Sequence, residues 1–228
     1  MPRLHCAVLT LLLCSTHAAT AQDAPADPAT AAMVALNVVL PQATEVALAL
    51  SAAPPHLRAE ATVYAYGRQG FQQVRAGSNG FSRLVNRDAF LYGVPAFKPT
   101  CWDVAGEATY LPVMLLVGEM LAAGRSHRDI RDAIDAGFAS GRFKRPTTGG
   151  VAYMLAGDVA VDPTTGQVTR QFFAGHYMFY AVGSTSAQLG FSAEAARRDP
   201  TLPSVFAGGA GGSHGLAYII AVPGGTSH

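Results

Sequence analysis

Cysteine is scarce in this chain, and most of it lies at one end. Only three of the 228 residues are Cys, and two of them, Cys6 and Cys14, fall within the first 21 residues. Those residues have the features of a secretory leader. If the leader is removed, Cys101 is the only cysteine left, which excludes an intramolecular disulfide even in an oxidising compartment. The stability of the fold must then come from its core.

The leader is predicted from three features of residues 1–21. They contain one basic residue, Arg3, an apolar stretch at 7–13, and the small-residue run Ala19-Thr20-Ala21. This order is typical of a secretory signal peptide with an A-x-A cleavage site. We therefore expect cleavage after residue 21 and export to the periplasm or the extracellular space. Residues 22–40 are expected to be a flexible lead-in, and residues 41–228 a single domain.

Net charge and long apolar runs are also lacking. Loss of Arg3 with the leader leaves 16 − 1 = 15 basic side chains against 15 acidic ones. This balance gives no electrostatic footprint for nucleic acid or for an anionic membrane. No apolar run after the leader approaches the ~20 residues of a membrane span, so we expect a soluble protein without a transmembrane segment.

The motifs of common catalytic and cofactor sites are absent too. The chain has no Gly-Lys pair for a P-loop, no H-E-x-x-H zinc helix and no G-x-S-x-G nucleophile elbow. Its glycine loop at 208–215 has His214 where G-x-G-x-x-G requires glycine, and an apolar run follows instead of a helix. The sequence therefore reveals no cofactor.

The first half of the domain predicts one helix and three strands. A helix over 44–53 is expected to end at Pro54-Pro55. Three β-prone runs at 62–66, 71–75 and 81–85 are separated by "GRQG" and "GSNG". Short glycine-bounded spacers between such runs predict a three-stranded antiparallel meander.

The middle of the chain predicts two helices. Residues 106–124 form one long apolar pattern, with Pro112 either in the first turn or at a kink. Ser126 and Asp129 have the spacing of a capping box, which predicts the start of the second helix. The apolar face of that helix is expected to consist of Ile130, Ile134 and Phe138.

The last third returns to strands, at 150–158, 167–173, 176–182 and 215–222. The last two are apolar on both faces, which predicts central strands that are covered on both sides. A short helix is expected near 186–189. The chain as a whole predicts an α+β fold, with a mostly antiparallel sheet of about five or six strands packed with two or three helices.

Several longer segments carry a resemblance. They are "NGF" at 79–81, "CWDVAGEATYLP" at 101–112, "GFASGRFKRPTTGGVAYMLAGD" at 137–158, "HYMFYA" at 176–181 and "AYIIAVP" at 217–223. Together they resemble an uncharacterised family of exported bacterial proteins with no assigned activity, so the resemblance implies no chemistry. Its members often carry a second cysteine two residues after "NGF", where this chain has Arg83. The resemblance implies that Cys101 has lost a disulfide partner, and that the Cβ atoms of residues 83 and 101 lie within about 4.5 Å.

Two histidines stand at the start of apolar runs, His176 and His214. Either each ring is partly buried and hydrogen-bonded to backbone, or the two meet at one edge of the sheet. In the second case they could be metal ligands, or an acid and a base. Parallel neighbouring strands would bring the rings together, whereas antiparallel neighbours would hold them roughly 20 Å apart.

Cys101 stands beside the only tryptophan, Trp102, and close to Asp103. A cysteine becomes a nucleophile when a nearby cation or helix N-terminus lowers the pKa of its thiol. The predicted helix begins several residues later, and a catalytic dyad would need His176 or His214 within reach. Burial beside Trp102 is the plainer interpretation, because free cysteine is among the most buried residue types.

A basic loop follows the second predicted helix and contains Arg142, Lys144 and Arg145. These cations either complement the dipole of the helix or bind the carboxylate or phosphate of a ligand.

The function hypothesis that follows is a non-catalytic ligand-binding or interaction module of the bacterial cell envelope. Its partner would be an unidentified small molecule or an envelope protein, and no nucleic acid. The alternative is a small hydrolase or metal-dependent enzyme that uses Cys101, His176 and His214.

Overall fold

The computed structural model describes residues 27–199, 202, 204–207 and 216–222. The predicted signal peptide, His214 and His228 lie outside these ranges.

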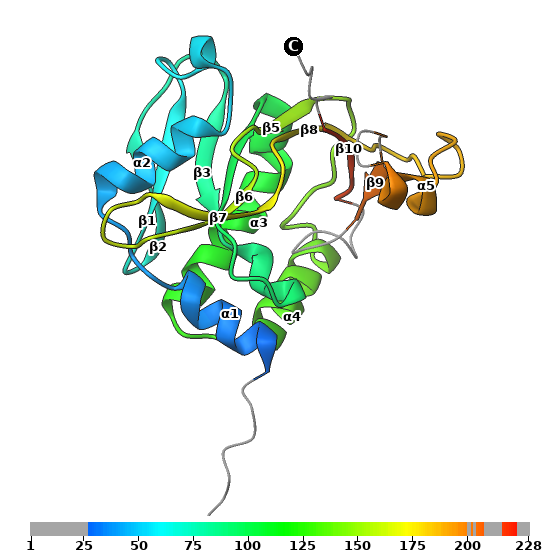
Figure 1. Ribbon diagram of the computed structural model, residues 1–228. Helices are drawn as coiled ribbons and strands as arrows, with labels where there is room; N and C mark the ends of the chain where they lie inside the picture. Colours follow the sequence, from blue (N-terminus) through cyan, green and yellow to red (C-terminus); the bar gives the residue numbers. More distant parts are fainter. Residues whose placement is uncertain (1–26, 200–201, 203, 208–215, 223–228) are drawn as a thin grey trace, which may run out of the picture.

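The described strands form one large mixed sheet and one small hairpin (Figure 1). The eight-stranded sheet has the order β2-β1-β3-β4-β5-β8-β10-β9, and β6 pairs with β7 in the two-stranded one. The bounds are β1 Thr62–Gly67, β2 Gly70–Arg75, β3 Ser82–Asn86, β4 Lys98–Trp102, β5 Val151–Met154, β6 Asp158–Val161, β7 Val168–Phe173, β8 His176–Tyr180, β9 Ser204–Phe206 and β10 Tyr218–Ala221. The α+β class is confirmed, but the sheet is larger than the five or six strands predicted.

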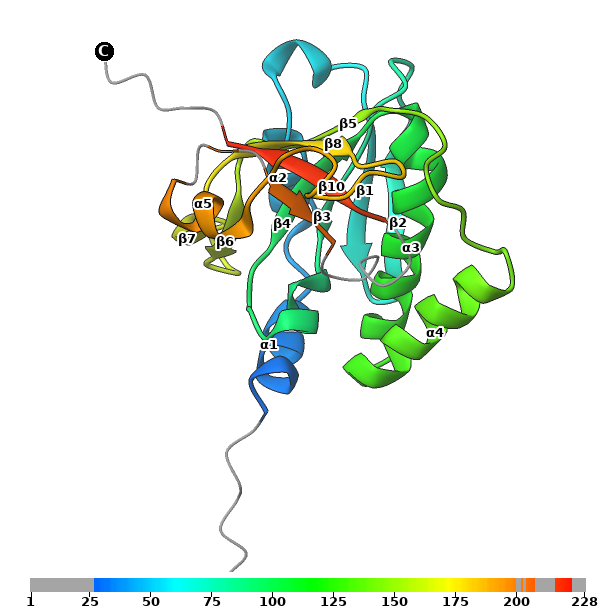
Figure 2. The same cartoon turned by 90° about the vertical axis from the view of Figure 1, so that its right-hand side faces the viewer.

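Five α-helices and two short 3₁₀ helices accompany the sheet within the described ranges. They are α1 Pro28–Leu36, α2 Gln42–Ser51, η1 Pro55–Leu57, η2 Asp88–Tyr92, α3 Val104–Ala122, α4 His127–Ala139 and α5 Ala193–Arg198. Figures 1 and 2 show α2 on one side of the sheet and α3 on the other.

The alternation of side chains along β3 and β4 assigns each residue to one of these two sides. Arg83 donates to the carbonyl of Leu50 in α2, so the odd-numbered residues of β3 face α2. Their antiparallel partners in β4, such as Cys101, share that face. The even-numbered residues Thr100 and Trp102 therefore face α3.

The long helix α3 is confirmed, and it begins at Val104, two residues before the predicted start. Pro112 lies in its third turn rather than the first. The helix is long and apolar enough, by length and composition, to cross a membrane, which the sequence prediction did not anticipate. In the fold it is a core helix: 56% of its most apolar window is buried against the sheet and α4.

The predicted meander is correct for its first turn and wrong for its second. β1 and β2 form an antiparallel hairpin, but β3 runs parallel to β1. Residues 76–81 do not form a tight turn, because Ser78 and Asn79 donate their backbone N–H groups to the carbonyl of Glu60. This segment carries the chain back past the start of β1, so β3 enters beside β1 in the same direction.

Residues 22–40 were predicted to be a flexible lead-in, but residues 28–36 of this segment form the helix α1. Asp27 caps α1 by accepting from Ala29 N, and Pro28 occupies its first turn. Leu36 and Leu40 are buried in the main core. The domain therefore starts before residue 41.

Two predictions about the C-terminal third also fail. Residues 186–189 form turns, and the helix lies further on at α5, capped by Ser192. β8 is central but not covered on both sides, since Phe179 is 45% exposed on the face opposite α3.

Candidate functional site

Cys101 lies in a small apolar cluster on the α2 face of the sheet. Its neighbours there are Ala52, Ala53, Phe81 and Tyr153, and its thiol is fully buried. Burial raises the pKa of the Cys101 thiol to about 12, although the guanidinium of Arg83 opposes the shift. A thiol with this pKa is not an activated nucleophile at neutral pH.

Arg83 is the direct cross-strand partner of Cys101 between β3 and β4. The two positions are therefore neighbours in the sheet, while the Cβ–Cβ distance within about 4.5 Å and the loss of a disulfide partner stay predictions. Arg83 is itself fully buried, and its guanidinium donates to the backbone carbonyls of Leu50 and Leu57. In this chain residue 83 ties β3 to the end of α2 and to η1.

Burial of Cys101 leads to a testable difference in labelling. We expect the native protein to resist iodoacetamide at pH 8 over a period in which the same protein in denaturant reacts fully. Native labelling should be slower by on the order of 10²-fold or more, because both access and thiolate formation are suppressed. Labelling of the native thiol at the rate of the unfolded chain would contradict the assignment of Cys101 to the core.

Asp103 is fully engaged in holding the fold. Its side chain caps α3 by accepting from Gly106 N at 3.0 Å, and it also accepts from the Tyr180 hydroxyl at 2.7 Å and from Val151 N at 2.8 Å. It therefore joins the start of α3 to β5 and β8, which gives Asp103 a structural role.

The basic loop after α4 lies on the surface. Arg142, Lys144 and Arg145 are exposed, with Arg142 over the ring of Phe143 at 5.2 Å and Arg145 over that of Phe138 at 5.5 Å. None of these three side chains lines the cavity next to His176 that is described below. An anion site at this loop stays a prediction.

His176 faces the opposite side of the sheet from Cys101. Cys101 pairs with Tyr153, and Tyr153 with Tyr177, so these three share the α2 face. His176, one residue before Tyr177, pairs with Met154 on the α3 face. The structure thus separates Cys101 from His176 by the thickness of the sheet. β8 and β10 are adjacent and antiparallel, and His214 lies outside the described residues.

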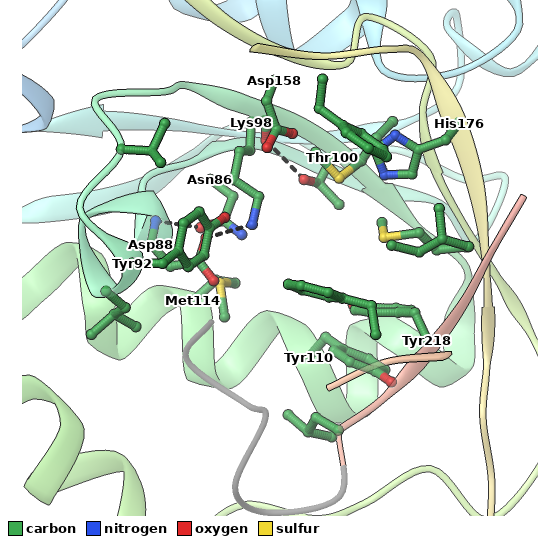
Figure 3. Close-up of a pocket in the computed structure, with 18 of the residues that line it drawn as sticks. Asn86, Asp88, Tyr92, Lys98, Thr100, Tyr110, Met114, Asp158, His176 and Tyr218 are labelled. Carbon is green, nitrogen blue, oxygen red and sulfur yellow. Dashed lines mark hydrogen bonds and ion pairs between the residues drawn. The ribbon is translucent and has the colours of Figure 1, made fainter. Parts of the chain in front are cut away.

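A cavity of about 720 Å³ lies on the α3 face, next to His176 (Figure 3). It is bounded by α3 and η2, by strands β4 to β8, and by the C-terminal strands. Its lining consists of Asn86, Asp88, Leu91, Tyr92, Val94, Lys98, Thr100, Trp102, Tyr110, Met114, Arg131, Met154, Asp158, Phe172, Phe173, His176, Met178, Phe206, Ala207, Leu216, Tyr218 and Ile220. Most of these side chains are apolar or aromatic, as is usual for a small-molecule site.

One end of the cavity is polar and charged. The ammonium of Lys98 and the carboxylate of Asp88 form a buried ion pair at 2.8 Å. Burial alone would lower the pKa of Lys98, but Asp88, Tyr92 and Asp158 together raise it above its usual value. Lys98 is therefore a cation, and burial raises the pKa of the adjacent Tyr92 to about 12, so Tyr92 is a neutral phenol.

An aromatic wall closes the cavity on the side of α3. The rings of Tyr110 and Tyr218 stack at 4.3 Å, and the Trp102 indole N–H donates to the Tyr218 hydroxyl at 3.1 Å. The Tyr110 hydroxyl donates to the carbonyl of Ala217 at 3.0 Å. These contacts fix the rings, so the wall is rigid and its polar atoms are satisfied from within the protein.

No group of three or more His, Cys, Asp or Glu side chains with metal-binding geometry occurs in the part of the chain that the structure describes.

Comparisons with protein-family models, with curated proteins and with solved structures find no match.

Sequence reasoning found His176 but missed the rest of this site. Asn86, Lys98 and Asp158 come from three different strands, or the turns beside them, and no motif connects them. The available signal was Lys98, one of only two lysines in the chain, which stands between Phe97 and Pro99 in an otherwise apolar segment. A lone lysine in such a segment must either pair or snorkel to solvent.

Proposed function

We propose that this protein is an exported, non-catalytic binding protein that holds a small, largely apolar molecule in the cavity between the sheet and α3. The observation that carries the proposal is the combination of volume and lining. A cavity of about 720 Å³ has apolar and aromatic walls and a small set of convergent polar groups at one end. This combination is what positions and orients a ligand in most small-molecule sites.

The binding role is favoured over hydrolysis by the positions of the candidate catalytic residues. Cys101 is buried on the other face of the sheet, and Asp103 is engaged by the backbone and by Tyr180. Of the proposed catalytic set, His176 alone is a described residue that lines the cavity.

Filling the cavity tests this function. Met114 of α3 lines the cavity, whereas Met120 of the same helix is half-buried and does not. We expect Met114→Trp to weaken binding of a neutral apolar fluorescent probe, N-phenyl-1-naphthylamine, by about tenfold or more, because the indole occupies the ligand volume. The readout is the rise of probe fluorescence on transfer from water to an apolar site.

Met120→Trp is the matched control and should bind the probe as the unsubstituted protein does. Met178→Trp, on β8 across the cavity, should repeat the effect of Met114→Trp from a second direction. Thermal unfolding of each variant checks that the fold is retained. A folded Met114→Trp protein that binds the probe with unchanged affinity would rule out this cavity as the binding site.

A further inference from the structure

Asp158 has one buried carboxylate oxygen for which the described residues supply no hydrogen-bond donor. It begins β6 and lines the charged end of the cavity, where Figure 3 shows it above Lys98 and Thr100. Its Oδ1 atom is buried and has no hydrogen-bond partner among the described residues. Burial of a carboxylate is costly unless donors compensate it, so an unpartnered one in a cavity points to a missing donor.

The neighbouring charges do not supply that donor. The Lys98 ammonium lies 2.8 Å from Asp88, and no ion pair within 4.0 Å joins Lys98 to Asp158. Burial raises the pKa of Asp158, and the positive charge of Lys98 opposes that shift. With both carboxylates ionised, Lys98, Asp88 and Asp158 carry +1 − 1 − 1 = −1 beside largely apolar walls. Arg131 of α4 is the other charged residue of the lining, and it is partly exposed to solvent. Water screens this guanidinium more than it screens Lys98 and Asp88, which are both buried.

His176 of β8 presents a second acceptor to the cavity. Its Nδ1 lies 2.8 Å from the carbonyl of Ala174, so Nδ1 carries the proton and donates to that oxygen. Burial lowers the pKa of His176, the hydrogen bond to Ala174 opposes this shift, and Lys98 adds to it, so the ring is neutral at pH 7. Its Nε2 is then an unprotonated acceptor, and no described residue donates to it.

The aromatic rings that line the cavity are compatible with a positive charge on the ligand. Tyr92 already lies with its ring centroid 5.4 Å from the Lys98 ammonium, so this end of the cavity accommodates one cation over an aromatic face. Tyr110 and Tyr218 offer further ring surfaces.

We propose that Asp158 anchors the ammonium group of the ligand, and that the cavity takes a primary amine carried on an apolar body. The ammonium supplies three donors and one positive charge. Asp158 accepts from it, His176 Nε2 offers a second acceptor, and the added positive charge offsets the net negative charge of Lys98, Asp88 and Asp158. The apolar body lies along Met114, Met154, Met178 and the aromatic wall. This assignment rests on the proposed binding function of the cavity.

A matched series of ten-carbon ligands tests the assignment. Decylamine, decanol and decanoate share one apolar chain and differ in the head group, and each displaces N-phenyl-1-naphthylamine from the cavity if it binds there. At pH 7 and below their micelle concentrations, we expect decylamine to compete at a concentration about tenfold or more lower than decanol, the ratio typical of one charge-assisted hydrogen bond. Decanoate should be the weakest of the three.

Asp158→Asn is the decisive variant, because it removes the charge and keeps the shape. In this variant we expect decanol and decylamine to displace the probe at concentrations that differ by no more than about threefold, because one charge-assisted hydrogen bond has been lost. Glu119→Gln removes one negative charge from an exposed position on α3 and should leave the preference for the amine intact. Thermal unfolding confirms that both variants are folded.

The outcomes separate the two proposals. Probe binding with no preference for decylamine, or a preference that survives in Asp158→Asn, overturns the role of Asp158 and leaves the binding function standing. A preference for decanoate that Arg131→Gln abolishes assigns the head-group site to an anion instead. Failure of the probe and of all three ligands to bind contradicts the binding function itself.

Discussion

Arg87→Met is expected to lower the free energy of unfolding by about 3–5 kcal/mol, because it leaves Glu45 as a buried charge without its partner. The two side chains form an ion pair at 2.7 Å and both are completely buried. Arg87 also donates to the carbonyl of Leu36 at 2.7 Å, and its guanidinium lies over the ring of Tyr66 at 4.2 Å. One side chain therefore joins the end of α1, the first turn of α2 and the end of β3.

The double variant Glu45→Leu with Arg87→Met distinguishes an orphaned charge from a lost contact. Because it removes both charges together, we expect it to be more stable than either single variant, although it still loses the bond to Leu36. Glu194→Ala is the surface control, since its pair with Arg198 is largely exposed and should contribute less than about 1 kcal/mol. Denaturant unfolding monitored by circular dichroism gives the free energy of unfolding of the two single variants, the double variant and the surface control. A single variant that unfolds at the midpoint of the unsubstituted protein would refute the structural role of the pair.

Asp103→Ala has the second-largest expected effect. It should lower the free energy of unfolding by about 2–4 kcal/mol, because it removes a helix cap and two further hydrogen bonds. The carboxylate caps α3 and accepts from Val151 N and from the Tyr180 hydroxyl, which is buried. Its removal leaves the Val151 donor without its side-chain acceptor, and weakens the junction of α3 with β5 and β8.

A conservative variant and a second cap separate these contributions. Asp103→Asn keeps one oxygen acceptor, and we expect it to retain part of the stability that Asp103→Ala loses. Ser126→Ala removes the exposed cap of α4 and should lower the free energy of unfolding by about 1 kcal/mol. If Asp103→Ala costs no more than Ser126→Ala, the links from Asp103 to β5 and β8 do not contribute to stability.

Features set by neighbouring residues could be predicted from the sequence. The capping box of Ser126 and Asp129 is present in the structure, and Ile130 and Ile134 of α4 are buried as their spacing predicted. The hairpin of β1 and β2 also forms as its glycine-bounded spacer indicated. In each case the interactions that decide the structure span only a few residues.

Features set by distant contacts could not be predicted. β4 lies in the middle of the sheet although it contains Pro99, which normally argues against a central strand. The parallel pairing of β1 with β3 depends on how residues 76–81 bind to Glu60, and no local pattern encodes that contact. Both features arise from tertiary packing.

In the candidate site, too, the sequence drew attention to neighbouring residues and did not reveal contacts between distant ones. Cys101 and Asp103 drew attention because they stand beside the only tryptophan, and both have structural roles. The charged end of the cavity joins Asp88, Lys98 and Asp158, which come together only when β4 and β6 are brought side by side. Export, and kinship with the exported bacterial family, stay predictions.

Methionine-methyl NMR tests the central claim, that ligands occupy the cavity on the α3 face. Met114, Met154 and Met178 line the cavity, whereas Met33 and Met120 do not. In protein labelled at the methionine methyl groups, addition of N-phenyl-1-naphthylamine should shift the resonances of the first three and leave those of the other two in place. Shifts confined to Met33 or Met120, or a spectrum unchanged at saturating probe, would contradict the account.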